Sequence, residues 1–136
     1  MFTHQTTIRV RYAETDQMGF VYYGNYAAFY EVARVEALRS LGLTYKNMEA
    51  DGIIMPVAEN SSKYIRPARY DDLLQINLAI RDLPEKRITF HYEILNEQNE
   101  LIHIGKTKLA FLDKNSGRPR KAPRNIIDLL KPFFDV

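Results

Sequence analysis

The sequence YAAFYEVA, residues 26–33, has the composition of a helix that the rest of the chain encloses. Only Glu31 in it carries a charge, whereas a helix lying on a protein surface shows a continuous polar stripe. We therefore expect the first turns of this helix to be largely enclosed. Glu31 is three residues from Arg34, which is the spacing of an ion pair on one helix face.

The helix is expected to begin at Gly24 or Asn25 and to end at Leu41. Asn25 is a suitable N-cap, and Gly42 holds the place of the left-handed residue that follows a helix. The later turns carry polar residues, which predicts that this end reaches solvent: Arg34, Glu36, Arg39 and Ser40.

Before the helix, residues 7–12 alternate between polar and apolar and predict a half-buried strand. The apolar face consists of Ile8, Val10 and Tyr12. If the chain stays extended to Asp16, the two-residue period places Glu14 and Asp16 on that same face. An acid would then be aimed at the core, just ahead of the helix.

After the helix, a short helical or turn segment at residues 44–51 is followed by alternating strands around residues 74–81 and 88–94. Residues 83–86 and 96–99 are turns. The alternation changes phase near Gly105, which predicts a β-bulge there. A last amphipathic helix is expected from Pro123, with this apolar stripe: Ile126, Ile127, Leu130 and Phe133.

This order of elements predicts an α+β fold in which an antiparallel β-sheet wraps around a central α-helix. The chain of 136 residues is expected to form a single domain spanning residues 1–136. An open sheet exposes the hydrogen-bonding groups of its edge strands, and pairing of two copies is a common way to cover them. We therefore expect a homodimer.

Composition excludes several classes of protein. No cysteine is present, so disulfides and thiolate nucleophiles are excluded. The N-terminal residues resemble no signal peptide and no long apolar run occurs, which predicts a cytoplasmic protein without a membrane span. The net charge is only +2, so a nucleic-acid partner would need a local patch such as KNSGRPRKAPR, residues 114–124; we expect a solvated surface there and no nucleic acid.

Three motifs carry a resemblance to a known family. They are R-Y-x-E-T-D-x-x-G-x-V-Y-x-x-N-Y at Arg11–Tyr26, F-Y-E-x-A-R-x-E at Phe29–Glu36, and the weaker Y-I-R-P-A-R-Y-D-D at Tyr64–Asp72. With them the chain resembles the 4-hydroxybenzoyl-CoA thioesterase family of the hotdog fold, from about residue 7 to residue 113. The resemblance implies an acyl-CoA thioesterase that releases a free acid and coenzyme A.

The resemblance assigns the catalytic carboxylate to Asp16. It also implies that the backbone N–H of Tyr23, helped by that of Gly24, points at the thioester oxygen. The chemistry of a thioester needs these two parts, an activated nucleophile and a site for the charge on oxygen. Asp16 would either attack the carbonyl or deprotonate a water, and the sequence leaves both open. Many bacterial relatives carry histidine where this chain has Tyr23, so an assisting imidazole is absent.

The resemblance also implies a set of substrate-binding residues, some along the pantetheine path and some for the phosphates of coenzyme A. They are Gly19, Val21, Asn25, Ser61, Ser62, Lys63, Lys86 and Arg87, with Arg118, Arg120, Lys121 and Arg124 as further basic candidates. No metal is expected, because the three histidines lie on separate elements. No cofactor is expected beyond the coenzyme A of the substrate. The assembly expected is a homodimer, with a dimer of dimers, a homotetramer, as its further pairing; the sequence leaves dimer and tetramer both open.

Two other functions remain open at this point. The chain could bind acyl-CoA or an acyl carrier without turnover, or it could be a hotdog dehydratase, which needs a catalytic histidine paired with a helix acid. The acyl group also stays undetermined, because aromatic, short and long thioesters all suit an apolar pocket of unknown depth.

Overall fold

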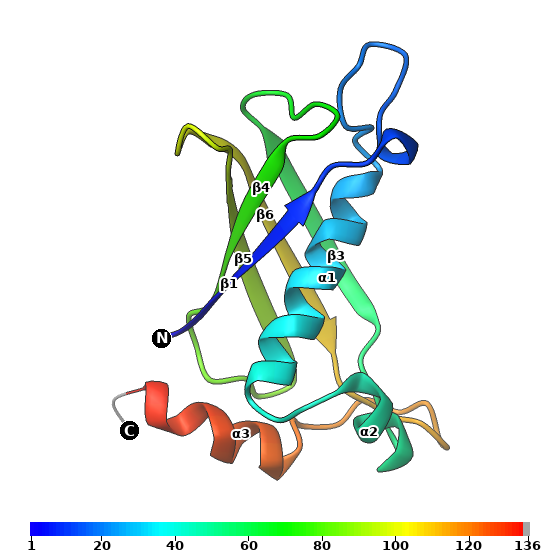
Figure 1. Cartoon of the computed structure of the whole chain (residues 1–136). Coiled ribbons are helices and arrows are strands. Elements are labelled where there is room, and N and C mark those ends of the chain that lie inside the picture. Colours follow the sequence, from blue (N-terminus) through cyan, green and yellow to red (C-terminus); the bar gives the residue numbers. More distant parts are fainter. Residues whose placement is uncertain (135–136) are drawn as a thin grey trace.

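The computed structural model describes residues 1–134, which form a curved antiparallel sheet with one long helix lying across it (Figure 1). The five strands run in the order β1-β4-β5-β6-β3. Their bounds are Phe2–Arg9 for β1, Val57–Tyr64 for β3, Leu73–Ile80 for β4, Arg87–Leu95 for β5 and Leu101–Ala110 for β6. This is the α+β architecture expected from the sequence.

The remaining elements lie mostly at the lower end of the sheet in Figure 1. The central helix α1 spans Asn25–Ser40, α2 spans Tyr45–Ala50 and α3 spans Arg124–Leu130. A small second sheet pairs β2, Ile53–Ile54, with β7, Leu112–Asp113. Two 3-10 turns cover Tyr12–Glu14 and Lys131–Phe133.

The core lies between α1 and the concave face of the sheet. The buried residues of α1 recur every three or four positions: Tyr26, Phe29, Tyr30, Ala33, Arg34, Ala37 and Leu38. Opposite them, β4 and β5 bury every second residue, as the alternation predicted: Leu74, Ile76, Leu78 and Ile80, then Ile88, Phe90, Tyr92 and Ile94. The helix, with a period of about 3.6 residues, and the strands, with a period of 2, therefore each direct one apolar face toward the same core.

The strand before α1 lies earlier in the chain than expected, at Phe2–Arg9 instead of residues 7–12. β1 ends at Arg9, and the 3-10 turn at residues 12–14 breaks the two-residue alternation. Tyr12 is 74% exposed and stacks on Tyr70, instead of facing the core. The parity argument that aimed Asp16 inward was therefore wrong, although Asp16 is half-buried through the loop described below.

The β-bulge exists, but it lies earlier than predicted. The register of β5 and β6 shifts where Ile94 pairs with His103 and Leu95 pairs with Leu101, which leaves Ile102 as the extra residue. Ile102 and His103 are consequently both buried, and Ile104 faces outward. The phase change near Gly105 had suggested a bulge at this glycine, which has another role.

Gly105 allows the ring of Tyr30 to lie against the backbone of β6. A Cβ at position 105 would lie 2.2 Å from the hydroxyl oxygen of Tyr30 and 2.3 Å from its Cζ. That ring cannot move easily, because it stacks on Tyr92 and its hydroxyl bonds to Ser62. The close approach, and not a turn, therefore requires glycine here.

Gly105→Ala is expected to lower the free energy of unfolding by about 1–3 kcal/mol, the usual cost of forcing an extra methyl group into a packed core. Denaturant unfolding followed by far-UV circular dichroism measures the change. Lys106→Ala, on the next residue of β6 but on the other face, is the control and should change stability little. Equal stability of Gly105→Ala and the wild type would contradict this packing argument.

Helix α1 is covered by the sheet on one side only, so its first turns are less enclosed than expected. Ala27, Ala28, Glu31 and Val32 are exposed in the single chain, and Val32 keeps 44% of its surface. Arg34 differs in the opposite direction: it is buried and forms no ion pair with Glu31. Its position on the buried stripe of the helix outweighs its polarity.

Candidate active site

Asp16 sits in a tight loop that fixes one of its carboxylate oxygens. Oδ1 accepts hydrogen bonds from the backbone N–H groups of Met18, at 2.9 Å, and Phe20, at 3.2 Å. Gly19 has a φ of +81°, which a side chain would disfavour, and it allows this tight turn. The other oxygen, Oδ2, makes no hydrogen bond within residues 1–134. One oxygen therefore holds the loop while the other stays available for chemistry.

The first turn of α1 presents free backbone donors next to this loop. The N-cap is Gly24, with no side chain accepting from the helix start, so the expectation of Asn25 as N-cap was wrong. In the described residues the N–H groups of Tyr23 and Gly24 donate to no acceptor. Such unpaired N–H groups, at the positive end of the helix dipole, suit a developing negative charge.

Asn25 instead ties the helix start to the preceding loop. Its side-chain amide donates to the backbone oxygen of Glu14 at 2.8 Å, and the N–H of Tyr22 donates to the same oxygen at 2.8 Å. The N–H of Val21 donates to Ala68 at 2.8 Å, which joins this loop to the segment after β3. Asp16 and the helix N-terminus are therefore held together by backbone contacts.

The Asp16 pocket is a hollow of about 290 Å³ beside these groups. It is lined by Asp16, Met18, Phe20, Val21, Tyr23, Tyr26, Tyr64, Ile65, Arg66 and Pro67. The structure thus brings together Asp16, Val21 and Tyr23 from the predicted set. Sequence reasoning did not assign Tyr64–Pro67 to the site; the motif Y-I-R-P at those positions was the available signal. Arg66, the one basic residue of the lining, pairs with Glu100 at 2.9 Å.

The serine and lysine candidates of β3 divide between the two faces of the strand. Ser62 points under α1, where its hydroxyl lies 2.6 Å from that of Tyr30. Because side chains alternate along a strand, Ser61 and Lys63 lie on the opposite face, and both are exposed. None of these three lines the Asp16 pocket of the same chain.

Lys86 and Arg87 lie at the other end of the sheet from Asp16. The chain passes from Arg9 toward Asp16 at the end where Arg9 pairs with Leu73, whereas the turn before Arg87 follows the opposite end of β4. Lys86 lines a separate small hollow together with Lys121, near α3. A single chain therefore does not bring these cations to the Asp16 pocket.

A buried polar group lies beneath the first half of α1. The hydroxyl of Tyr30 hydrogen-bonds to Nε2 of His103, and the ring of His103 stacks on Tyr26 at 4.0 Å. Burial lowers the pKa of His103 to about 4, so the ring is uncharged at neutral pH. Its Nδ1 has no partner within residues 1–134. Tyr26 and Tyr30 of α1 are thus positioned by contacts with an uncharged histidine.

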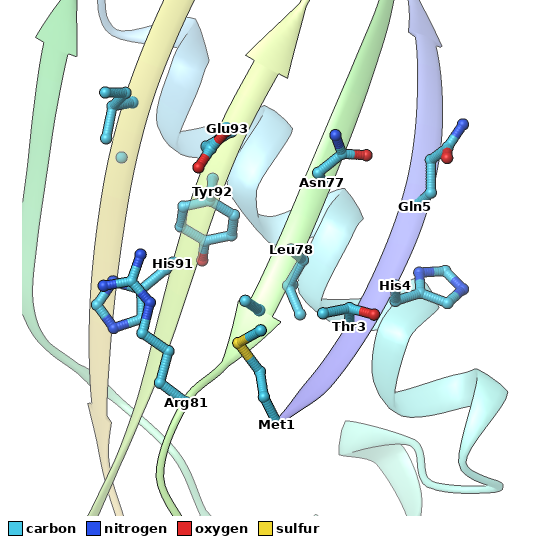
Figure 2. Close-up of a pocket in the computed structure, with 13 residues that line it drawn as sticks. Met1, Thr3, His4, Gln5, Asn77, Leu78, Arg81, His91, Tyr92 and Glu93 are labelled. Atoms are coloured by element: carbon cyan, nitrogen blue, oxygen red, sulfur yellow. The ribbon is translucent and has the colours of Figure 1, made fainter. Parts of the chain in front are cut away.

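A larger hollow than the Asp16 pocket lies elsewhere, on the face of the sheet away from α1 (Figure 2). It measures about 610 Å³ and contains none of the predicted site residues. Asn77, His91 and Glu93 extend into it from β4 and β5, while α1 lies behind the sheet. Its size alone does not connect it with the chemistry of Asp16.

No group of three or more histidine, aspartate or glutamate side chains within residues 1–134 is arranged to hold a metal ion. Across the same residues, every helix is too short or too polar to span a membrane.

Comparison with known proteins gives consistent matches. The profile of the Thioesterase-like superfamily matches residues 10–130. The acyl-CoA thioester hydrolase YbgC of Escherichia coli O157:H7 is 32% identical over 120 residues, which cover 88% of this chain and 90% of that protein. The structure of a DHNA-CoA thioesterase from Staphylococcus aureus has 36% identity and a TM-score of 0.85, covering 89% of this chain and 81% of that chain.

A more distant structure extends the same likeness. A mutant 4-hydroxybenzoyl-CoA thioesterase complexed with 4-hydroxybenzoyl-CoA has a TM-score of 0.82 at 20% identity, over 93% of this chain and 97% of that chain; at this identity the likeness shows the fold alone. The resemblance drawn from the sequence motifs and the expected hotdog fold are thereby confirmed. This chain belongs to the Thioesterase-like superfamily.

Proposed function

We propose that the protein hydrolyses acyl-CoA thioesters to a free acid and coenzyme A, with the reaction centred on Asp16. One observation carries this proposal: Asp16, whose Oδ2 makes no hydrogen bond within residues 1–134, and Tyr23, whose backbone N–H is unpaired there, line the same pocket, and Gly24 follows Tyr23 directly. The names of the relatives support it, since the Escherichia coli relative is called an acyl-CoA thioester hydrolase.

In the proposed reaction the thioester oxygen accepts hydrogen bonds from the N–H groups of Tyr23 and Gly24. These donors stabilise the negative charge that develops on that oxygen, and they need no reorganisation during the reaction. Asp16 takes a proton from a water that attacks the carbonyl carbon, or it attacks that carbon itself and water then hydrolyses the mixed anhydride to free acid and Asp16; in both cases the thiolate of coenzyme A leaves. None of the chain's three histidines lines this pocket of the same chain, and the proposed reaction assigns no role to an imidazole.

We further propose that two copies pair through β3. This strand is at the edge of the sheet and bonds only to β6, so one side of its backbone is open. Large apolar side chains are exposed on the loop before α1, on the open side of α1, and on β3 and the residue after it: Met18, Tyr22, Tyr23, Val32, Val57, Tyr64 and Ile65. A second copy would extend the sheet and cover this surface.

The phosphates of coenzyme A need cations near the mouth of the pocket. Arg66 is the basic residue that lines it, and we propose that it contributes in the same chain. Lys86 and Arg87 stay candidates from another copy, because their own chain holds them far from Asp16.

The proposal is tested by measuring release of free thiol from a panel of acyl-CoA thioesters, including benzoyl, phenylacetyl and straight-chain groups. We expect turnover of at least one of them by the purified protein. Binding of every thioester without thiol release would instead favour an acyl-CoA binding protein. Loss of water from a 3-hydroxyacyl thioester without thiol release would favour a dehydratase.

A further inference from the structure

Arg34 is a buried cation with no buried counter-charge. Its side chain is 6% exposed, and its partners are the hydroxyl groups of Tyr92, at 3.0 Å, Thr107, at 3.4 Å, and Tyr45, at 3.4 Å. Within residues 1–134 no carboxylate lies at ion-pairing distance from it. A buried charge is costly unless an opposite charge compensates it, so this arrangement needs an explanation.

The guanidinium opens into a hollow of about 250 Å³, which we call the Arg34 pocket. Nε and Nη1 make the three bonds above, whereas Nη2 makes none within the described residues. The walls are mainly apolar and come from Met48, Ile53, Met55, Val57 and Leu109. An apolar pocket with one charged donor at its base suits a ligand with an apolar body and an anionic end.

Two acids also line this pocket and act against an anion. Glu31 and Glu49 are both exposed, so solvent and salt screen their carboxylates. Arg34 is screened far less because it is buried. For a group that enters the pocket, the attraction of the guanidinium therefore outweighs the repulsion by the two glutamates, and the pocket favours an anion.

The proposed pairing through β3 relates this pocket to the reaction. Val57, at one end of β3, lines the Arg34 pocket, and Tyr64, at the other end, lines the Asp16 pocket. In one chain the two ends are separated by roughly 23 Å of strand. When two β3 strands pair antiparallel along their full length about a two-fold axis, which is the register we propose, Val57 of one copy comes beside Tyr64 of the other. Each Arg34 pocket then adjoins the Asp16 pocket of the second copy.

We propose that the Arg34 pocket binds the distal carboxylate of an ω-carboxyacyl thioester whose carbonyl is held in the Asp16 pocket of the second copy. The protein would thus prefer thioesters of dicarboxylic acids to those of simple fatty acids. This inference rests on the proposed thioesterase function and on the β3-paired dimer.

The test compares kcat/KM for pairs of thioesters with equal chain length: glutaryl-CoA with pentanoyl-CoA, adipoyl-CoA with hexanoyl-CoA, and suberoyl-CoA with octanoyl-CoA. We expect the ω-carboxyacyl member to be preferred at least about tenfold at one length or more, since a group that pairs with a buried charge discriminates strongly. Arg34→Met should abolish this preference while the fatty acyl member is still hydrolysed. Glu36→Gln, on the same helix but outside the pocket, should keep it.

A second variant covers the case in which Arg34→Met fails to fold. Met55→Glu adds a negative charge to the pocket wall without removing any hydrogen bond of Arg34, and it should lower turnover of the ω-carboxyacyl member selectively. Hydrolysis of fatty acyl-CoA with no ω-carboxyl preference at any length would overturn this inference alone. A preference that survives both Arg34→Met and Met55→Glu would also overturn it. Absence of hydrolysis for every thioester of this panel, with hydrolysis of benzoyl- or phenylacetyl-CoA, would overturn this inference alone; absence of hydrolysis for those aromatic thioesters as well would overturn the proposed function.

Discussion

Asp16→Asn is expected to lower kcat/KM for acyl-CoA hydrolysis by about 10³-fold or more, because Asp16 is the one carboxylate that lines the pocket within residues 1–134. The fold should persist. Oδ1 of asparagine can accept the same two N–H groups that Oδ1 of Asp16 accepts, and the new amide replaces an oxygen that has no partner within residues 1–134. Thiol release under steady-state conditions measures the rate, and thermal unfolding checks the fold.

Asp113→Asn is the matched control for that substitution. Asp113 also accepts two backbone N–H groups through Oδ1, those of Asn115 and Ser116, but it is the last residue of β7 and lies outside the Asp16 pocket. The control variant should keep its activity. Turnover by Asp16→Asn close to that of Asp113→Asn would refute the assignment of Asp16 as the catalytic carboxylate.

The order of elements could be predicted because the patterns that encode it are local. The alternation in β4 and β5 and the helical spacing in α1 both depend on the side of each element that the core covers. The segment of α2 is equally local, since Thr44 accepts from the N–H of Asn47 at the helix start. Gly42, with a φ of +84°, follows α1 in the left-handed conformation as expected.

The errors concern features that depend on contacts distant in sequence. Gly105 was interpreted as a bulge residue, but the ring that requires it belongs to Tyr30, on another element. Arg34 was expected at the surface because charged side chains usually are; three hydroxyl groups from α2, β5 and β6 allow it to be buried. The exposed side of α1 was not predicted. Apolar residues on a helix indicate that it is buried, but they do not tell whether the same chain or a second copy buries it.

The candidate site was predicted only in part for a related reason. The motif around Asp16 identified the loop and the helix start, which are adjacent in sequence. The other wall of the pocket consists of Tyr64–Pro67. It is held there by backbone hydrogen bonds such as that from Val21 to Ala68. These bonds join residues distant in sequence, so no local pattern predicts them. Lys86 and Arg87 were assigned to the same site as Asp16 by resemblance alone. They lie far from Asp16 in one chain, so they could reach an Asp16 pocket only from another copy.

Val32→Glu is expected to convert the proposed dimer into a monomer and to remove most of the activity with it. Val32 is on the open side of α1 and is 44% exposed in the single chain, so the fold should tolerate a charge there. In the proposed dimer the second copy would bury that charge without a partner. An unpaired buried charge costs roughly 3–5 kcal/mol, which raises the dissociation constant about 10²- to 10³-fold or more.

Sedimentation velocity combined with thiol release, at several protein concentrations, measures both effects. We expect the activity of the variant to recover as concentration rises, in step with the dimer fraction, because the exposed rims of the Asp16 pocket at Tyr23 and Tyr64 need a second copy to cover them. Leu129→Glu, a similar change at an exposed apolar position of α3, is the control and should remain dimeric and active. Full activity of a monomeric Val32→Glu variant would show that catalysis does not require the dimer. A Val32→Glu variant that remains dimeric would show that the dimer interface lies elsewhere.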